Sequence, residues 1–219
     1  MIFLRNYVAL AATIMLVLSL VFYLLPELRD QLHQEDQLVE NITVFIYLIV
    51  VACALGGLFY VKGSYDKSIM LLFLILGLLT SLEELSYGER YFGFNVPRIL
   101  DYKMDTVHDL FFLFFKAVKD LDELYGAGVF LLVAVLGGAL LYLLYRIREH
   151  ILPLSMRFVR LPPFFYIFIF FTLGVTALFV DLGIFKYDIM QVLEEGLEMN
   201  AALALVFGCV AALRLQTNE

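Results

Sequence analysis

Long apolar segments recur along this 219-residue chain, and they restrict its fold more than any other feature. Six of them are long enough, at roughly 17–25 residues each, to cross a hydrocarbon core of about 30 Å as an α-helix. They cover residues 7–25, 42–61, 68–87, 126–145, 164–180 and 189–213. A helix satisfies its own backbone hydrogen bonds in lipid, whereas an open sheet edge does not. The sequence therefore predicts an all-α polytopic membrane helix bundle with six transmembrane helices, forming a single membrane domain over 1–219.

Composition and the N-terminal segment agree with this class. The chain is 63% hydrophobic and 17% charged, against about a quarter charged residues in soluble domains. Its net charge of −7 does not suit nucleic-acid binding, which requires basic patches. The first apolar segment continues well beyond Ala12, so we interpret it as an uncleaved helix rather than a signal peptide. Cys53 and Cys209 each lie alone in an apolar segment, which predicts two packed thiols.

The charges of the loops indicate an orientation. With a cytoplasmic N-terminus, the inner segments hold eight basic and three acidic residues, and the outer segments hold seven and nineteen. The inner basic residues lie in short loops, four of them within 145–161, as the positive-inside rule expects. We therefore predict a bacterial cytoplasmic (inner) membrane protein with both termini in the cytoplasm.

The longest connection, residues 88–125, lies on the outer side in this orientation. It contains VHDLFFLFFKAV, an apolar run of about a dozen residues that is too short to span the membrane. Such a run predicts an interfacial or re-entrant helix at the outer face. Two interpretations stay open, an amphipathic connector and a lid over a site.

Adjacent glutamates occur twice beside apolar segments, in LEEL at 82–85 and in LEEG at 193–196. If the six spans form two inverted sets of three, one pair lies near the end of the third span and the other near the start of the sixth. Both pairs then lie near the outer face, about one helical turn inside. At about 100° per residue, each pair shares a helix face with other side chains. The two sets are Thr80, Glu83, Glu84 and Tyr87, and Gln191, Glu194, Glu195 and Glu198; Asn200 points away.

Two interpretations fit these glutamates. In the first, they are solvated helix ends, and the dipole at the start of the sixth span stabilises Glu194 and Glu195. This explains little about Glu83 and Glu84, which lie at a helix C-terminus, or about Glu198. In the second, the carboxylates converge, and their repulsion requires a cation among them.

His108 is the histidine of the outer apolar segment, and it completes a ligand set for a divalent metal. Carboxylates with imidazole suit zinc, iron or manganese, and a bound metal would activate a water molecule. The predicted metal ligands are Glu84, His108, Glu195 and Glu198, with Glu83 and Glu194 as catalytic carboxylates. Arg90 and Tyr87 are predicted to bind substrate, Arg90 through a phosphate or carboxylate. No Glu-x-x-His occurs, so the di-iron carboxylate pattern is not matched.

Small residues at four-residue spacing predict close helix contacts. They are Ala52 and Gly56 in the second span, Ala134 and Gly138 in the fourth, and Ala204, Gly208 and Ala212 in the sixth.

The stretch LEELSYGERYFGFNVP, followed by MDTVHDL, resembles an uncharacterised family of bacterial multipass membrane proteins. The family pattern is roughly E-E-x-S-W-G-Q-R-x-F-G, then a proline and a stretch with a histidine. The matching positions are Glu83, Glu84, Ser86, Gly88, Arg90, Phe92, Gly93, Pro97 and His108. Tyr87 stands in place of the tryptophan and Glu89 in place of the glutamine. The resemblance implies that residues 83–108 act as one unit, and it names no reaction.

Two functions follow from these patterns. The first is a metal-dependent hydrolase or transferase with an outward-facing carboxylate and histidine site that acts on a lipid or lipid-linked substrate at headgroup level. The alternative is a transporter or an accessory subunit of a membrane complex, whose acidic cluster binds a cation, a proton or a basic partner. Both place the protein in a lipid bilayer, and neither involves nucleic acid.

Overall fold

The chain divides into two compact units in a computed structural model that describes most of the first unit and part of the second. The first unit comprises Met1–Leu85 and Leu161–Glu219, and the second comprises Ser86–Arg160. The described residues are 2–33, 38–85, 98–99, 102–103, 162–181, 187–217 and, between 113 and 142, the positions 113, 116–121, 123, 128, 131–132, 135–139 and 142.

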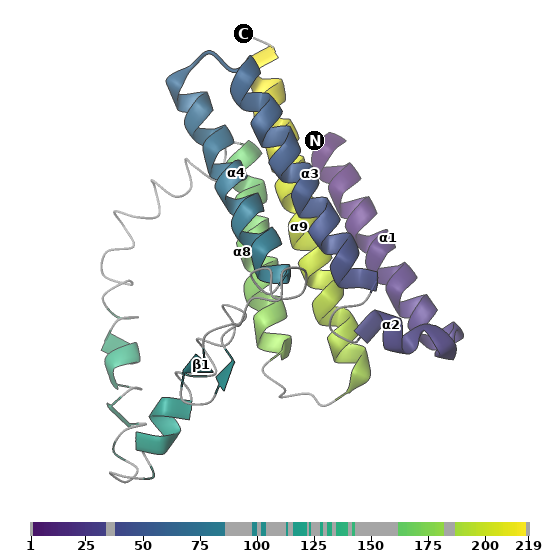
Figure 1. The fold of residues 1–219 in the computed structure, drawn as a ribbon, viewed down its shortest axis with the longest axis vertical. Coiled ribbons are helices and arrows are strands. Elements are labelled where there is room, and N and C mark those ends of the chain that lie inside the picture. Colours follow the sequence, from purple (N-terminus) through teal and green to yellow (C-terminus); the bar gives the residue numbers. More distant parts are fainter. Residues whose placement is uncertain are drawn as a thin grey trace. The chain divides into compact units, whose positions relative to one another are not determined.

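Long apolar helices build the first unit (Figure 1). They are α1 (Ile2–Leu24), α3 (Leu38–Tyr60), α4 (Ser64–Glu84), α8 (Pro162–Asp181) and α9 (Asp188–Thr217). All five are long and apolar enough to cross a membrane. They confirm five of the six predicted spans, with most boundaries shifted by a few residues. The fourth predicted span, 126–145, lies largely outside the described residues.

Two short helices and a hairpin were not predicted. The helices η1 (Pro26–Leu28) and α2 (Arg29–His33) follow α1 in the first unit. In the second unit, β1 (Arg98–Ile99) pairs antiparallel with β2 (Tyr102–Lys103). Residues 116–121 are helical, and most of the predicted interfacial helix before them lies outside the described residues.

The helices of the first unit run in two opposite directions. The ring of Phe3, at the start of α1, contacts that of Phe207 near the end of α9, so these two helices are antiparallel. Tyr166, at the start of α8, also contacts Phe207, so α8 runs parallel to α1. Near the start of α4, Met70 meets Gly57, which lies beside Leu213 of α9. Thus α1, α4 and α8 run one way, and α3 and α9 run the other way (Figure 1).

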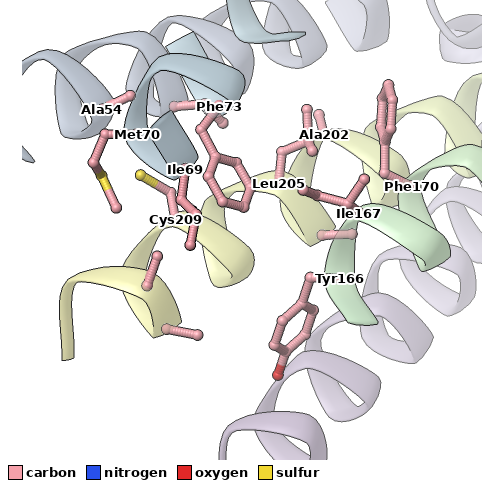
Figure 2. Packing of buried hydrophobic residues seen from close by; sticks show 14 of the residues in the cluster. Ala54, Ile69, Met70, Phe73, Tyr166, Ile167, Phe170, Ala202, Leu205 and Cys209 are labelled. Atoms are coloured by element: carbon pink, nitrogen blue, oxygen red, sulfur yellow. The ribbon is translucent and has the colours of Figure 1, made fainter. Parts of the chain in front are cut away.

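Helix α9 forms the centre of the core because it packs against α1, α2, α3, α4 and α8. Its side chains Ala202, Leu205 and Cys209 are fully buried and interleave with Phe73 of α4 and Ile167 of α8 (Figure 2). The two cysteines are free, as predicted. Tight packing of this kind fixes the level at which each helix presents its polar residues.

Glycines mark the closest helix approaches. A Cβ atom on Gly208 would lie 2.8 Å from Phe73 Cζ, which confirms the predicted contact surface on α9. The prediction for α3 is wrong in its register: nothing lies within 4 Å of a Cβ on Gly56, whereas one on Gly57 would lie 2.5 Å from Met70 Sδ. Among the described residues, nothing lies within 4 Å of a Cβ on Gly138 either. Helix contacts form one residue further along α3 because Gly57, and not Gly56, faces α4.

Candidate carboxylate site

The glutamates of α4 occupy the last turn of that helix. Glu83 and Glu84 are its final two residues, and Leu85 caps it. They therefore lie at the helix end itself and not one turn inside, as the sequence suggested. This is the negative end of the helix dipole, where a carboxylate is disfavoured.

The glutamates of α9 lie in its second turn, close to the predicted depth. Because α9 begins at Asp188, the only acidic residue in its first turn is Asp188. Glu194 and Glu195 lie in the second turn, and the influence of the dipole fades within the first. Dipole stabilisation therefore accounts for Asp188 but not for the glutamate pair.

Helix α4 packs against both α3 and α9, so the contact on which the site depends is present. In Figure 1 α4 ends and α9 begins toward the same end of the bundle. Glu84 interacts electrostatically with Glu195 and Glu194 of α9, with its neighbour Glu83, and with Glu40 of α3. Glu198 interacts with Glu84 and Glu83 as well as with both glutamates of the α9 pair. Three helices thus bring carboxylates into one cluster, defined here as the glutamate cluster: Glu40, Glu83, Glu84, Glu194, Glu195 and Glu198.

Tyr47 of α3 lies against this cluster. Its side chain is 3% exposed, it shares a side-chain hydrogen bond with Thr80, and it interacts with Glu83, Glu84 and Glu198. The Thr80 hydroxyl donates to the Leu76 carbonyl at 2.8 Å. Thr80 and both α4 glutamates therefore lie on the side of α4 that faces Tyr47.

All six members of the glutamate cluster are partly buried, and Oε2 of Glu195 is fully buried. Solvated helix ends would instead leave their carboxylates exposed to water. Carboxylates close together in a medium of reduced dielectric repel one another more strongly than in bulk water. The arrangement gathers carboxyl groups from three helices and supplies oxygen donors from them, from the Tyr47 phenol and from the Thr80 hydroxyl.

Three predicted site residues, Tyr87, Arg90 and His108, lie outside the described residues. The described part of the chain contains no group of three or more His, Cys, Asp or Glu side chains placed to hold a metal ion. The predicted ligand set of Glu84, His108, Glu195 and Glu198 therefore stays a prediction, as do the catalytic roles of Glu83 and Glu194 and the substrate-binding roles of Tyr87 and Arg90.

Sequence reasoning missed Glu40 and Tyr47. Glu40 was assigned to the first loop, but α3 begins at Leu38 and places it in the first turn. Tyr47 lies inside the predicted second span, 42–61, and was given no role there. The spacing of Glu40, Thr43 and Tyr47 puts them on one face of a helix. This polar face is the sequence feature that could have identified Glu40 and Tyr47 as candidate site residues.

Five long apolar helices in one chain define a multipass membrane protein. Comparison with protein-family models, curated proteins and solved structures finds no match to this chain. The family resemblance of residues 83–108 stays a prediction, and the function rests on the geometry above.

Proposed function

We propose that this multipass membrane protein binds a cation at the glutamate cluster, where the described carboxylates alone do not form a metal-holding group and a further ligand such as His108 would complete the site. The observation that carries the proposal is the convergence of carboxylates from α3, α4 and α9 beside the buried Tyr47. Clustered negative charges repel, and a cation bound among them lowers the free energy of the folded state. The acidic cluster would serve a transporter or an accessory subunit as its cation site.

The donor chemistry indicates which cations fit. In the described residues, the donors at the cluster are carboxylate, phenol and hydroxyl oxygens. Oxygen donors suit hard cations such as Ca²⁺, Mg²⁺ and Mn²⁺. A contribution from His108 would move the preference toward zinc or iron, so the metal preference reports whether His108 joins the site.

A metal-dependent enzyme acting on a lipid-linked substrate is the second candidate. The position of Glu83 and Glu84 at the end of a membrane helix favours it, because this is the level at which lipid headgroups lie. In this version, Arg90 binds the headgroup phosphate and the metal activates water.

Thermal unfolding in detergent tests the cation site. Wild-type protein is stripped with chelator and then titrated separately with Ca²⁺, Mn²⁺ and Zn²⁺. Saturation at about 100 times the dissociation constant stabilises the folded state by about 2.7 kcal/mol. Glu84→Gln and Glu195→Gln should lose this response, whereas Glu27→Gln, an exposed residue of η1, should keep it. A wild-type melting temperature that ignores all three metals contradicts the proposal.

Bound-metal analysis separates the two candidates. Metal content is measured in wild type and in Glu84→Ala, Glu195→Ala and His108→Ala. Loss in all three supports the mixed site of an enzyme, whereas retention in His108→Ala alone supports the oxygen-only site. Absence of stoichiometric metal from the wild type after equilibration rules out the enzyme version.

A further inference from the structure

The two cysteines of the chain face each other across the interface between α3 and α9. These helices run in the same direction and pack together, and a Cβ atom on Gly57 would lie 3.0 Å from Leu213 Cδ2. Cys53 precedes Gly57 by four residues, and Cys209 precedes Leu213 by four. Residues four apart lie one above the other on a helix, so the two thiols meet one turn earlier along both helices. An electrostatic interaction between Cys209 and Cys53 agrees with this placement.

A third sulfur atom lies close to the two thiols. Met70 of α4 is fully buried, and its Sδ atom lies 2.5 Å from the position that a Cβ on Gly57 would take. It is therefore about one helical turn from Cys53. In Figure 2 the sulfur atoms of Met70 and Cys209 point toward each other. Cys209 is buried and Cys53 half-buried, so the three sulfur atoms gather where α3, α4 and α9 meet.

The surroundings of these sulfur atoms favour a soft metal ion. The same core cluster contains Ile69, Phe73 and Leu205, whose side chains have no oxygen or nitrogen atom to offer. Thiolate and thioether sulfur select Cu⁺, whereas hard cations prefer the oxygen donors of the glutamate cluster. Zn²⁺ in proteins almost always takes four ligands, and Cu⁺ accepts fewer. The donor set therefore suits Cu⁺ best.

We propose that Cys53 and Cys209 bind one Cu⁺ ion between α3 and α9, with the Met70 thioether as a third, weaker ligand. Each thiol releases its proton to solvent and forms a copper–sulfur bond, so one Cu⁺ and two thiolates make a complex with a single negative charge. No electron is transferred. The three rotatable bonds of methionine let its sulfur approach the ion.

This sulfur site is separate from the glutamate cluster. Cys53 lies about two turns before the end of α3, whereas Glu40 lies in the first turn of that helix. The sulfur site therefore does not rest on the function proposed for the cluster, and its test uses a different ion.

Competition for Cu⁺ tests the site in detergent-solubilised protein. Reduced protein is titrated without oxygen against Cu⁺ held by a coloured chelator, and copper transfer is read from the loss of colour. Wild type should take up one Cu⁺ per chain. Cys53→Ser should weaken binding by about 100-fold or more and Met70→Leu by about tenfold, since even residues that only support a metal ligand contribute roughly 10–100-fold. Glu84→Gln should bind copper as wild type does, and wild-type affinity in Cys53→Ser overturns the proposal.

Gly56→Cys supplies the matched control for position. In a Cys53→Ser background it returns a second thiol to α3, on a face where nothing among the described residues lies within 4 Å of a Cβ. This relocated variant should not regain the Cu⁺ affinity. Recovery of wild-type affinity would show that two thiols at any position on these helices suffice, and the proposed site would then be wrong.

A trivalent arsenical tests independently whether the two thiols are close enough to share one ion. Phenylarsine oxide condenses with two neighbouring thiols, forming two arsenic–sulfur bonds and releasing one water, and excess monothiol removes it from a single thiol. Intact-mass measurement should find one arsenical retained by wild type and none by Cys53→Ser or the relocated variant. Loss of the arsenical from wild type contradicts the facing pair. An arsenical retained by a wild type that takes up no Cu⁺ overturns the metal site.

Discussion

At the scale of single residues, two glycines on neighbouring helices differ in their surroundings. Gly208 lies against Phe73 and Tyr166, whereas nothing lies within 4 Å of a Cβ built on Gly56. Both fit the same small-residue pattern, and the pattern was right for α9 and wrong for α3. The reason is rotational: four-residue spacing identifies a face of a helix but does not show whether a neighbouring helix or lipid covers that face.

Alanine substitution tests this difference. Gly208→Ala places a methyl group 2.8 Å from Phe73 Cζ and 3.0 Å from Tyr166 Cβ, so it should destabilise the fold by roughly 1–3 kcal/mol through overpacking. Gly56→Ala should be neutral or slightly stabilising because alanine is the better helix former. Chemical or thermal unfolding in detergent compares the two. Equal effects would contradict the packing described for α4 and α9.

Tyr47 and Thr80 form the second pair that can be tested at this scale. Tyr47→Phe keeps the ring in its buried position and removes the hydroxyl that bonds Thr80, a loss of about 1 kcal/mol in unfolding free energy. Thr80→Val should cost a similar amount. Because the two hydroxyls share one bond, the double variant should cost less than the two single variants added together. Strict additivity would show that the two hydroxyls do not interact.

At the scale of elements, the positions of the apolar segments predicted the helices well, and their ends less well. The long apolar segments correspond to α1, α3, α4, α8 and α9, because about 20 apolar residues in lipid have to be helical. The end of α4 at Glu84 was placed three residues late, and the start of α3 at Leu38 four residues late. Polar residues are tolerated in helix turns at the interface, so hydropathy alone does not mark where these helices begin and end. The hairpin of β1 and β2 gave no such signal, since each strand has only two residues.

Helix α1 should be separable from the rest of its unit by one substitution. Gly196→Leu places a side chain where Met15 and Leu18 lie, so α1 should lose its packing on α9. Hydrogen–deuterium exchange should then increase in α1 while α3 and α4 stay protected. Gly174→Leu on α8, which meets nothing within 4 Å, is the matched control. Faster exchange throughout the unit would show that α1 is not an independent element.

At the scale of the whole molecule, the helix directions constrain the chain between α4 and α8. These two helices run parallel, so α4 ends and α8 begins at opposite ends of the bundle (Figure 1). If all five long helices of the first unit span the membrane, the chain between α4 and α8 has to cross it an odd number of times. This requirement supports the predicted fourth span at 126–145.

Of the glutamate cluster, the sequence predicted the members on α4 and α9 from their spacing. It could not show that these helices touch, because contact depends on tertiary packing.

Cysteine labelling tests the topology and the orientation together. In a background without Cys53 and Cys209, Lys62→Cys and Arg148→Cys should react with an impermeant reagent only from the cytoplasmic side. Glu27→Cys and Lys103→Cys should react only from the outer side. Labelling of Lys103→Cys and Arg148→Cys from the same side would contradict a fourth span, and reversal of all four would contradict the orientation.

The central position of α9 has a consequence for biosynthesis. The ribosome makes this helix after α1, α3, α4 and α8, yet all four pack against it. The earlier spans therefore enter the bilayer before α9 is made. Their small and polar residues that pack against α9 are buried only once α9 is present. Assembly of the bundle has to follow the synthesis of α9, and a chain interrupted before residue 188 would insert into the membrane without the helix that the other four pack against.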